Sequence, residues 1–434
     1  MELILTTGYT VFFIYLIGRL KFFKIEGLSP TVMKVAFLVK LLAAVALGLV
    51  YTYYYTERYT ADTFKYFDDG AILFSSVFHD PVLFLKMISG IGGITPEMQL
   101  YYDRMTNWYD TFSPFNDNRS MIRFNALIYP VTMGKYYVHA AIISFLSFTG
   151  ITAIIKVFAR YHHTQVREAF AVFILLPSTL FWCSGLLKDS LAMFVLGGLI
   201  LFMDRFIHSY EKRSGLITAV MLSSLLLMVV KFQVFFILIP VIATWLMSKQ
   251  ILRSPLKTMI ISGTVYFILL LIVDHLFLKN GLLTLLHEKQ KAFFTLAEEA
   301  GAGSYINIPV LYPDLKGLLS VIPSGLFNGV FRPFITDQRN IMMMVSGIEN
   351  TLIILFMLFA IIRGNFRYIK DSPFAVLSIY FSISLLTLIG MITPVLGALV
   401  RYKALALPFL VTFFIIIAKD RIPVLKRLVD RIMT

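Results

Sequence analysis

Charged residues are scarce in this sequence of 434 residues. Only 15% of them are Asp, Glu, Lys or Arg, whereas 58% are hydrophobic. Soluble domains are typically about 45–50% apolar and about 25% charged, so a water-soluble enzyme could not cover its surface with so few charges. The sequence also has a single cysteine, which excludes an internal disulfide and a cysteine-based zinc site. Disorder is excluded as well, because Phe, Leu, Ile and Tyr dominate throughout.

Acidic residues are the rarer of the two charges, with 25 against 39 basic residues and a net charge of +14. The basic residues do not cluster on polar faces with interleaved aromatics, so we expect no nucleic-acid partner. Just over half of them fall in every second short connection between apolar runs, as the positive-inside rule requires. The sequence therefore predicts a multi-pass protein of the cytoplasmic (inner) membrane, with its N-terminus outside and its C-terminus in the cytoplasm.

Apolar runs recur along the whole chain. Several have only about 15 residues, fewer than the roughly 20 of a perpendicular span, and the pairs within 169–204 and 215–248 are expected to form short hairpins. The runs predict an all-α, polytopic transmembrane helical bundle of about 11 helices. They lie at 3–18, 32–55, 138–158, 169–182, 190–204, 215–230, 234–248, 258–278, 346–362, 373–393 and 403–418.

Two long loops are predicted on the extracytoplasmic side, at 56–137 and 279–345. Apolar stretches within them, at 71–88 with a break at Pro81 and at 282–297, are expected to form interfacial helices. The chain then divides into an additional N-terminal helix with its cytoplasmic loop (1–31), a transmembrane module with the first outer loop (32–278), the second outer loop (279–345), and C-terminal transmembrane helices with a basic tail (346–434).

Three carboxylates cluster at the start of the first outer loop, within residues 61–70. If this segment is helical, Asp62 and Asp69 lie two turns apart on one face and Asp68 is displaced by about 100°. Carboxylates at a membrane boundary are costly unless paired and often mark function. One of them could act as a general base on an acceptor hydroxyl, or help to hold a divalent cation such as Mg²⁺ or Mn²⁺. The alternative is a solvated loop start with acids that cap the next helix.

A few basic residues break the positive-inside pattern because they fall on the predicted outer side. An ammonium or guanidinium group there is suited to a phosphate. The alternatives are a local Lys188–Asp189 pair, snorkelling of Lys231 to the headgroups, and anchoring of the arginines to anionic lipids. The candidate phosphate-binding residues are Lys188, Lys231, Arg332, Arg401 and Lys403, with Arg123 as a weaker member of the set.

Some aromatic residues are candidates for stacking on a sugar ring: Tyr66, Trp108, Tyr109 and Tyr402. Membrane interfaces also enrich Tyr and Trp, and for residues 101–115 such an interfacial belt is the favoured interpretation. The histidines lack the spacing to carboxylates or thiols that a metal site needs, so no zinc site is predicted. No glycine-rich nucleotide loop is present either.

The order of helices and loops after the first helix resembles the GT-C class of polytopic glycosyltransferases, which use polyprenyl-phosphate sugars on the outer leaflet. In that class an outward helix, here 32–55, precedes a long outer loop with an acidic residue near its start, which matches Asp62 in Ala-Asp-Thr-Phe-Lys-Tyr. The stretch Arg401-Tyr402-Lys403, with Pro408, resembles the last outer turn of such enzymes. The tip Ser-Gly-Leu-Leu-Lys-Asp at 184–189 resembles a turn of O-antigen polymerase-like proteins.

The chain departs from the class in two respects. Its N-terminal helix is additional, and it lacks the tight Asp-Glu pair of protein mannosyltransferases, which argues against a protein acceptor. The resemblance implies an inverting hexosyl- or pentosyltransferase that transfers a sugar from a polyprenyl-phosphate donor to a lipid-linked glycan or glycolipid of the cell envelope. It implies Asp62, or else Asp68 or Asp69, as the base, and Lys188, Arg332 and Arg401, with Lys231, as ligands of the departing lipid phosphate.

Two alternatives remain open. An O-antigen-type polymerase or ligase would transfer whole oligosaccharides from a lipid diphosphate and would need no base at Asp62. A transporter or lipid flippase would place charges at mid-span and break helices in corresponding halves of the chain.

Overall fold

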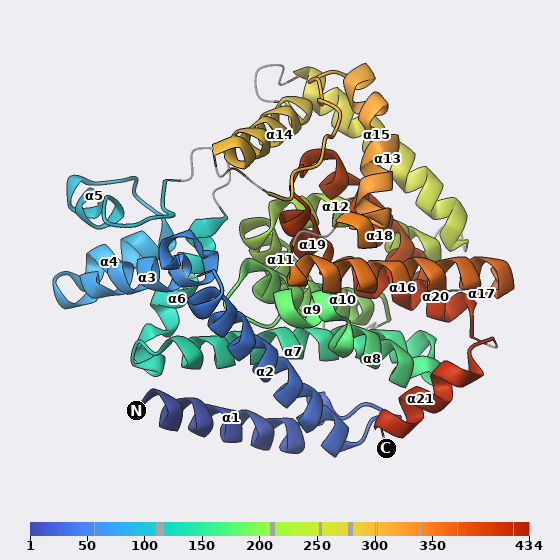
Figure 1. The fold of residues 1–434 in the computed structure, drawn as a ribbon, viewed down its shortest axis with the longest axis horizontal. Coiled ribbons are helices and arrows are strands. Elements are labelled where there is room, and N and C mark those ends of the chain that lie inside the picture. Colours follow the sequence, from blue (N-terminus) through green and yellow to red (C-terminus); the bar gives the residue numbers. More distant parts are fainter. Residues whose placement is uncertain are drawn as a thin grey trace. The chain divides into compact units, whose positions relative to one another are not determined.

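The computed structural model describes residues 1–55, 57–109, 117–208, 213–250, 254–276, 281–299, 301, 303–337, 340–370, 372–419 and 421–433. The regular secondary structure of these residues is helical, apart from one isolated antiparallel bridge between Tyr305 and Val395 (Figure 1). The predicted all-α fold class is therefore confirmed. Residues 277 and 278, at the end of the predicted run 258–278, lie outside the described part of the chain.

Six helices in the described residues are long and apolar enough to cross a membrane: α2 (Pro30–Tyr53), α7 (Tyr136–Tyr161), α10 (Lys188–His208), α13 (Pro255–Leu276), α16 (Ile341–Arg363) and α18 (Pro373–Ile392). A seventh candidate is the pair α19 (Leu396–Lys403) and α20 (Leu407–Ile417), which is bent by 57° at its break. These helices fit the membrane protein that the composition predicts. The total of about 11 spans and the orientation of the chain stay predictions.

The chain divides into two compact units. The first comprises Met1–Ile154, Leu180–Phe202 and Ser214–Phe232, and the second comprises Ile155–Thr179, Met203–Arg213 and Gln233–Thr434. Helices α7, α9 (Pro177–Trp182) and α10 contribute residues to both units. Short 3-10 turns lie at Lys21–Phe23, Arg58–Thr60, Ser76–Phe78, His163–Gln165 and Ile335–Asp337.

The first unit also contains α1 (Glu2–Arg19), α3 (Asp62–Ser75), α4 (Pro81–Ser89), α5 (Pro96–Tyr102), α6 (Asn118–Thr132) and most of α11 (Arg213–Val230). The break expected at Pro81 is present, because Asp80 accepts hydrogen bonds from the backbone N–H groups of Val82 and Leu83 and so starts α4. The packing of α7 on α10 depends on small residues. A Cβ on Gly150 would lie 2.3 Å from the Met193 carbonyl oxygen, so the two backbones approach closely there.

The second unit contains most of α12 (Phe232–Gln250), together with α8 (Val166–Leu175), α13, α14 (Leu282–Glu299), α15 (Leu315–Phe331), α16, α17 (Arg367–Lys370), α18, α19, α20 and α21 (Pro423–Met433). The helix expected at 282–297 is present as α14. The sequence analysis gave no helix to 315–331, yet α15 packs closely on α18 there. A Cβ on Gly329 would lie 2.0 Å from the Leu386 carbonyl oxygen, so this pair too is joined through glycine.

Candidate functional site

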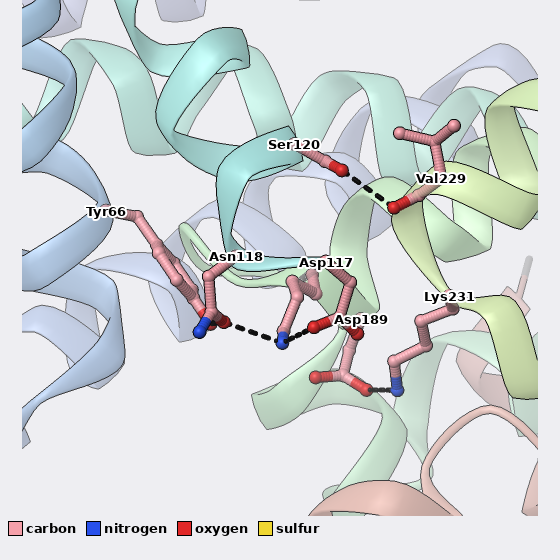
Figure 2. A network of polar contacts seen from close by, with 8 residues as sticks. Tyr66, Asp117, Asn118, Ser120, Asp189, Val229 and Lys231 are labelled. Carbon is pink, nitrogen blue, oxygen red and sulfur yellow. Dashed lines mark hydrogen bonds and ion pairs between the residues drawn. The ribbon is translucent and has the colours of Figure 1, made fainter. Parts of the chain in front are cut away.

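A polar network surrounds the start of α10 in the first unit (Figure 2). The Lys188 ammonium donates to Asp117 Oδ1 at 2.6 Å and to Asn118 Oδ1 at 2.9 Å. The next residue, Asp189, accepts a hydrogen bond from the Lys231 ammonium. Successive residues of a helix point about 100° apart, so these two neighbours reach different partners. Lys188 and Lys231, two of the basic residues that the sequence singled out, are therefore each paired with a carboxylate in this network.

Helix α3 contributes to the same network. The Tyr66 hydroxyl donates to Asn118 Oδ1 at 2.9 Å, and the Lys188 ammonium lies 5.9 Å from the centre of the Tyr66 ring. Asp62 precedes Tyr66 by one helical turn, so both lie on the same face of α3. The half-buried Asp62 is near enough for its charge to act on the Lys188 ammonium. The structure thus brings together a carboxylate and an ammonium that the sequence proposed as base and phosphate ligand.

The other two aspartates of the predicted cluster have structural partners. Asp69 is buried and accepts hydrogen bonds from the backbone N–H groups of Thr106 and Asn107, at 2.9 and 2.8 Å. Burial raises the pKa of Asp69, and these hydrogen bonds partly offset the rise. Asp68 is partly exposed and forms a two-pronged ion pair with Arg58, at 2.7 and 2.9 Å. Of the three aspartates, Asp62 is the one whose charge acts on the Lys188 ammonium, so it is the candidate for the base.

Two of the predicted sugar-stacking residues, Tyr66 and Trp108, are buried in the structure. Tyr66 contacts Lys188 through its ring, and Trp108 stacks on Tyr102 with ring centres 4.0 Å apart. The Arg119 guanidinium lies 4.9 Å from the Trp108 ring. Protein groups therefore cover both rings in this structure, and their stacking on a sugar stays a prediction.

The remaining stacking candidates have exposed or half-buried rings. Tyr109 is 42% exposed, and Tyr402 is half-buried, with its ring 6.0 Å from that of Phe293. Arg123, the weaker phosphate candidate, donates from Nε to the Met87 carbonyl oxygen at 3.0 Å near the end of α4. Burial lowers the pKa of Arg123. Its observed contacts are therefore with this carbonyl oxygen and with the Trp108 ring, whose centre lies 5.5 Å from the guanidinium.

The sequence analysis missed a lysine that supports the turn before α10. Lys40 is fully buried near the middle of α2, and its ammonium donates to the Cys183 carbonyl oxygen at 2.5 Å and to Ser184 Oγ at 3.1 Å. Ser147 of α7 donates to the same carbonyl oxygen at 2.6 Å. A lysine eight positions after the start of the apolar run 32–55 was the available signal, since such charges rarely occur without a partner.

The second unit holds the other predicted phosphate ligands. Lys403 is buried, and its ammonium donates to the Arg332 carbonyl oxygen at 2.6 Å and to Asn350 Oδ1 at 2.9 Å. The Arg332 guanidinium lies 3.5 Å from Asp337, and Arg401 is half-buried in α19. The backbone carbonyl of Arg332 therefore accepts from Lys403, and the Arg332 guanidinium pairs with Asp337.

A buried carboxylate lies close to Lys403. Glu349 accepts hydrogen bonds from both the backbone N–H and the hydroxyl of Ser178. Glu349, Ser178, Asn350 and Lys403 line one small polar pocket of the second unit. No local pattern links Ser178 to Glu349, because 171 positions separate them along the chain.

The described residues include no group of three or more His, Cys, Asp and Glu side chains that could hold a metal ion. The divalent cation therefore stays a prediction. No family model, no curated protein and no solved structure matches the chain. The likeness to the GT-C class rests on the motifs and the order of loops in the sequence.

Proposed function

We propose that this chain is a membrane glycosyltransferase that transfers a sugar from a polyprenyl-phosphate donor to a lipid-linked glycan or another envelope acceptor on the extracytoplasmic face. The observation that supports it most is the proximity of Asp62 to Lys188, within the network at the start of α10. A general base and a cation for the leaving group are the two functions that such a transfer needs.

In the proposed reaction Asp62 takes the proton of the acceptor hydroxyl as its oxygen attacks the anomeric carbon. The bond from that carbon to the lipid phosphate breaks, and the electron pair leaves with the phosphate oxygen. The Lys188 ammonium stabilises the negative charge that grows on this oxygen. A phosphate has to compete with Asp117 for Lys188, so we expect Asp117 to move away from the ammonium when the donor binds.

The proposal is tested with the full chain reconstituted in lipid vesicles and supplied with a panel of polyprenyl-phosphate sugars. Release of polyprenyl phosphate is measured for the wild type and for Asp62→Asn. We expect the wild type to consume at least one donor and Asp62→Asn to be slower by about 10²–10⁴, the usual contribution of a general base. A wild type that consumes no donor in the panel contradicts the proposal. If Asp62→Asn keeps full activity and Lys188→Met loses it, an oligosaccharide polymerase without a base is favoured.

A transporter or lipid flippase is the second candidate, because two observations favour it. Lys40 and Glu349 are buried charges within candidate spans, and α19 and α20 form a bent pair. Transport folds place charges and broken helices in this way. In the same vesicles a flippase would move a fluorescent polyprenyl-phosphate lipid between leaflets and leave its sugar attached, whereas the transferase would detach the sugar.

A further inference from the structure

An apolar cavity of about 550 Å³ lies in the second unit, lined by residues of α8, α16, α20 and α21. Its size is typical of small-molecule sites, which range from about 300 to 1,000 Å³. Side chains such as Val172, Leu352 and Ile415 form the wall, and among the described residues that line it the ionisable ones are Glu168 and Glu349. One helix of this wall, α16, is long and apolar enough to cross a membrane, so we expect the wall to lie next to hydrocarbon.

Helix α21 lies beside one end of this cavity. Val429 of α21 is buried and lines the cavity together with Glu168 of α8. An ion pair of 2.7 Å between Arg167 and Asp430 joins α21 to α8. The opposite side of α21 exposes Arg427 and Arg431. A short helix with an apolar side on the protein and a basic side outward is typical of the membrane interface.

We propose that this cavity binds an acyl chain of an anionic phospholipid whose phosphate lies against the basic side of α21. The apolar wall is suited to the chain, and Arg427 and Arg431 are suited to the phosphate. The basic tail is predicted to be cytoplasmic, and the cytoplasmic leaflet carries the anionic lipids. A neutral lipid would fill the cavity equally well but would gain nothing from the two arginines. This proposal does not depend on the proposed transfer reaction.

The first test uses the purified full chain in detergent, stripped of lipid and titrated with phosphatidylglycerol or with phosphatidylcholine of the same chain length. Native mass spectrometry counts the bound lipids. We expect one phosphatidylglycerol to bind, and to bind more tightly than phosphatidylcholine. Equal affinity for the two lipids would overturn the role of α21, and the absence of a saturable site would overturn the proposal as a whole.

The second test fills the cavity. Val172→Phe enlarges a wall residue, and its matched control is Val265→Phe, at a 50% exposed position of α13 that does not line the cavity. We expect Val172→Phe to weaken both lipids at least fivefold and Val265→Phe to leave them unchanged. Leu175→Trp, at a 40% exposed wall position, replaces Val172→Phe if the latter does not fold. Unchanged binding in the folded cavity variant would overturn the proposal.

The third test removes the basic side of α21. Arg427→Gln with Arg431→Gln should weaken phosphatidylglycerol by roughly fivefold for each arginine, with little change for phosphatidylcholine. The control, Arg363→Gln with Arg367→Gln, removes two exposed arginines outside the cavity and α21. A loss of equal size in the control would show general attraction to anionic lipid and would contradict a site at α21.

Discussion

The start of α10 and the end of α19 both hold a lysine, but the two lysines meet different partners. Lys403 lies in the last turn of α19 and donates to the Arg332 carbonyl oxygen, just after α15. Helix C-termini leave carbonyl groups without partners and attract cations, so Lys403 is where a structural lysine is expected. Lys188 lies in the first turn of α10, where the helix dipole disfavours a cation. Its pairing with Asp117 offsets that cost.

The two lysines differ in their partners, and under the proposed function Lys403 stabilises the fold while Lys188 binds the phosphate. Lys403 already donates to backbone and amide oxygens at the end of α15 and in α16, which argues for a structural role that ties α19 to these two helices. Lys188 is only partly buried, is held by a carboxylate, and has Asp62 nearby. Of the lysines predicted to lie on the outer side, Lys188 is therefore the one whose surroundings suit a ligand phosphate.

The largest effect is expected for the buried pair of Lys231 and Asp189. Lys231→Met leaves the Asp189 carboxylate buried without its cation, and breaking such a pair typically costs about 3–5 kcal/mol of unfolding free energy. Adding Asp189→Asn removes the stranded charge and should restore most of the stability. Denaturant unfolding in detergent measures both variants. A stable single variant, or a double variant as unstable as the single one, would contradict a structural pair.

The second-largest effects are expected for Lys188→Met and Lys403→Met, which test the two lysines separately. Lys188→Met should lower the rate of sugar transfer by about 10²–10³, as removal of a group that stabilises developing charge does, without a matching loss of stability. Lys403→Met should lower the thermal unfolding midpoint and leave the transfer rate per folded molecule within about tenfold. The two rates are compared after correction for folded protein. The reverse outcome would place the phosphate ligand in the second unit.

A smaller effect is expected from Asp117, which competes with the donor phosphate. Asp117→Asn removes the competing charge but keeps a side-chain oxygen for Lys188, so the KM for the donor should fall by roughly fivefold, equivalent to about 1 kcal/mol. Steady-state kinetics over a range of donor concentration give this value. A higher KM would mean that Asp117 positions Lys188 and does not compete for it.

The smallest effect concerns the structural carboxylate Asp69. Because burial raises the pKa of folded Asp69 above its ordinary value near 4, the folded state holds this proton more tightly than the unfolded state. Stability from this group is present at low pH and is lost as the pH rises through the raised pKa. As the pH rises from the ordinary pKa of an aspartate to the raised pKa of Asp69, the wild type should therefore lose stability relative to Asp69→Asn. Unfolding midpoints measured at several pH values check the sign, and a constant difference would contradict it.

The sequence predicted the elements that depend on local composition. The apolar runs predicted the bounds of α2, α7, α16 and α18 to within a few residues, because an uninterrupted hydrophobic stretch of about 20 residues is typical of a membrane-spanning helix. Helix α15 was missed because Pro323 and several glycines interrupt its run. The Gly325-Leu-Phe-Asn-Gly329 spacing was the overlooked signal, since two glycines four residues apart allow close packing of helices in membranes.

The candidate site was predicted by residue type but not by partner. Lys188 and Asp62 were singled out as charges on the predicted outer side, yet nothing local links them to each other or Lys188 to Asp117, 71 positions away along the chain. The burial of Tyr66 and Trp108 could not be predicted from the sequence either, because an aromatic residue near polar groups is compatible with both a binding face and a packed core. Partners and burial depend on tertiary packing, which composition does not specify.

The central claim is that Asp62, and not its neighbour Asp68, is the base. Single-turnover release of polyprenyl phosphate by reconstituted Asp62→Asn and Asp68→Asn tests it with two identical substitutions six residues apart. We expect Asp62→Asn to be slower than the wild type by about 10²–10⁴. Asp68→Asn breaks only an exposed ion pair worth about 0–1 kcal/mol and should release lipid at the rate of the wild type. Equal rates for the two variants would contradict the account.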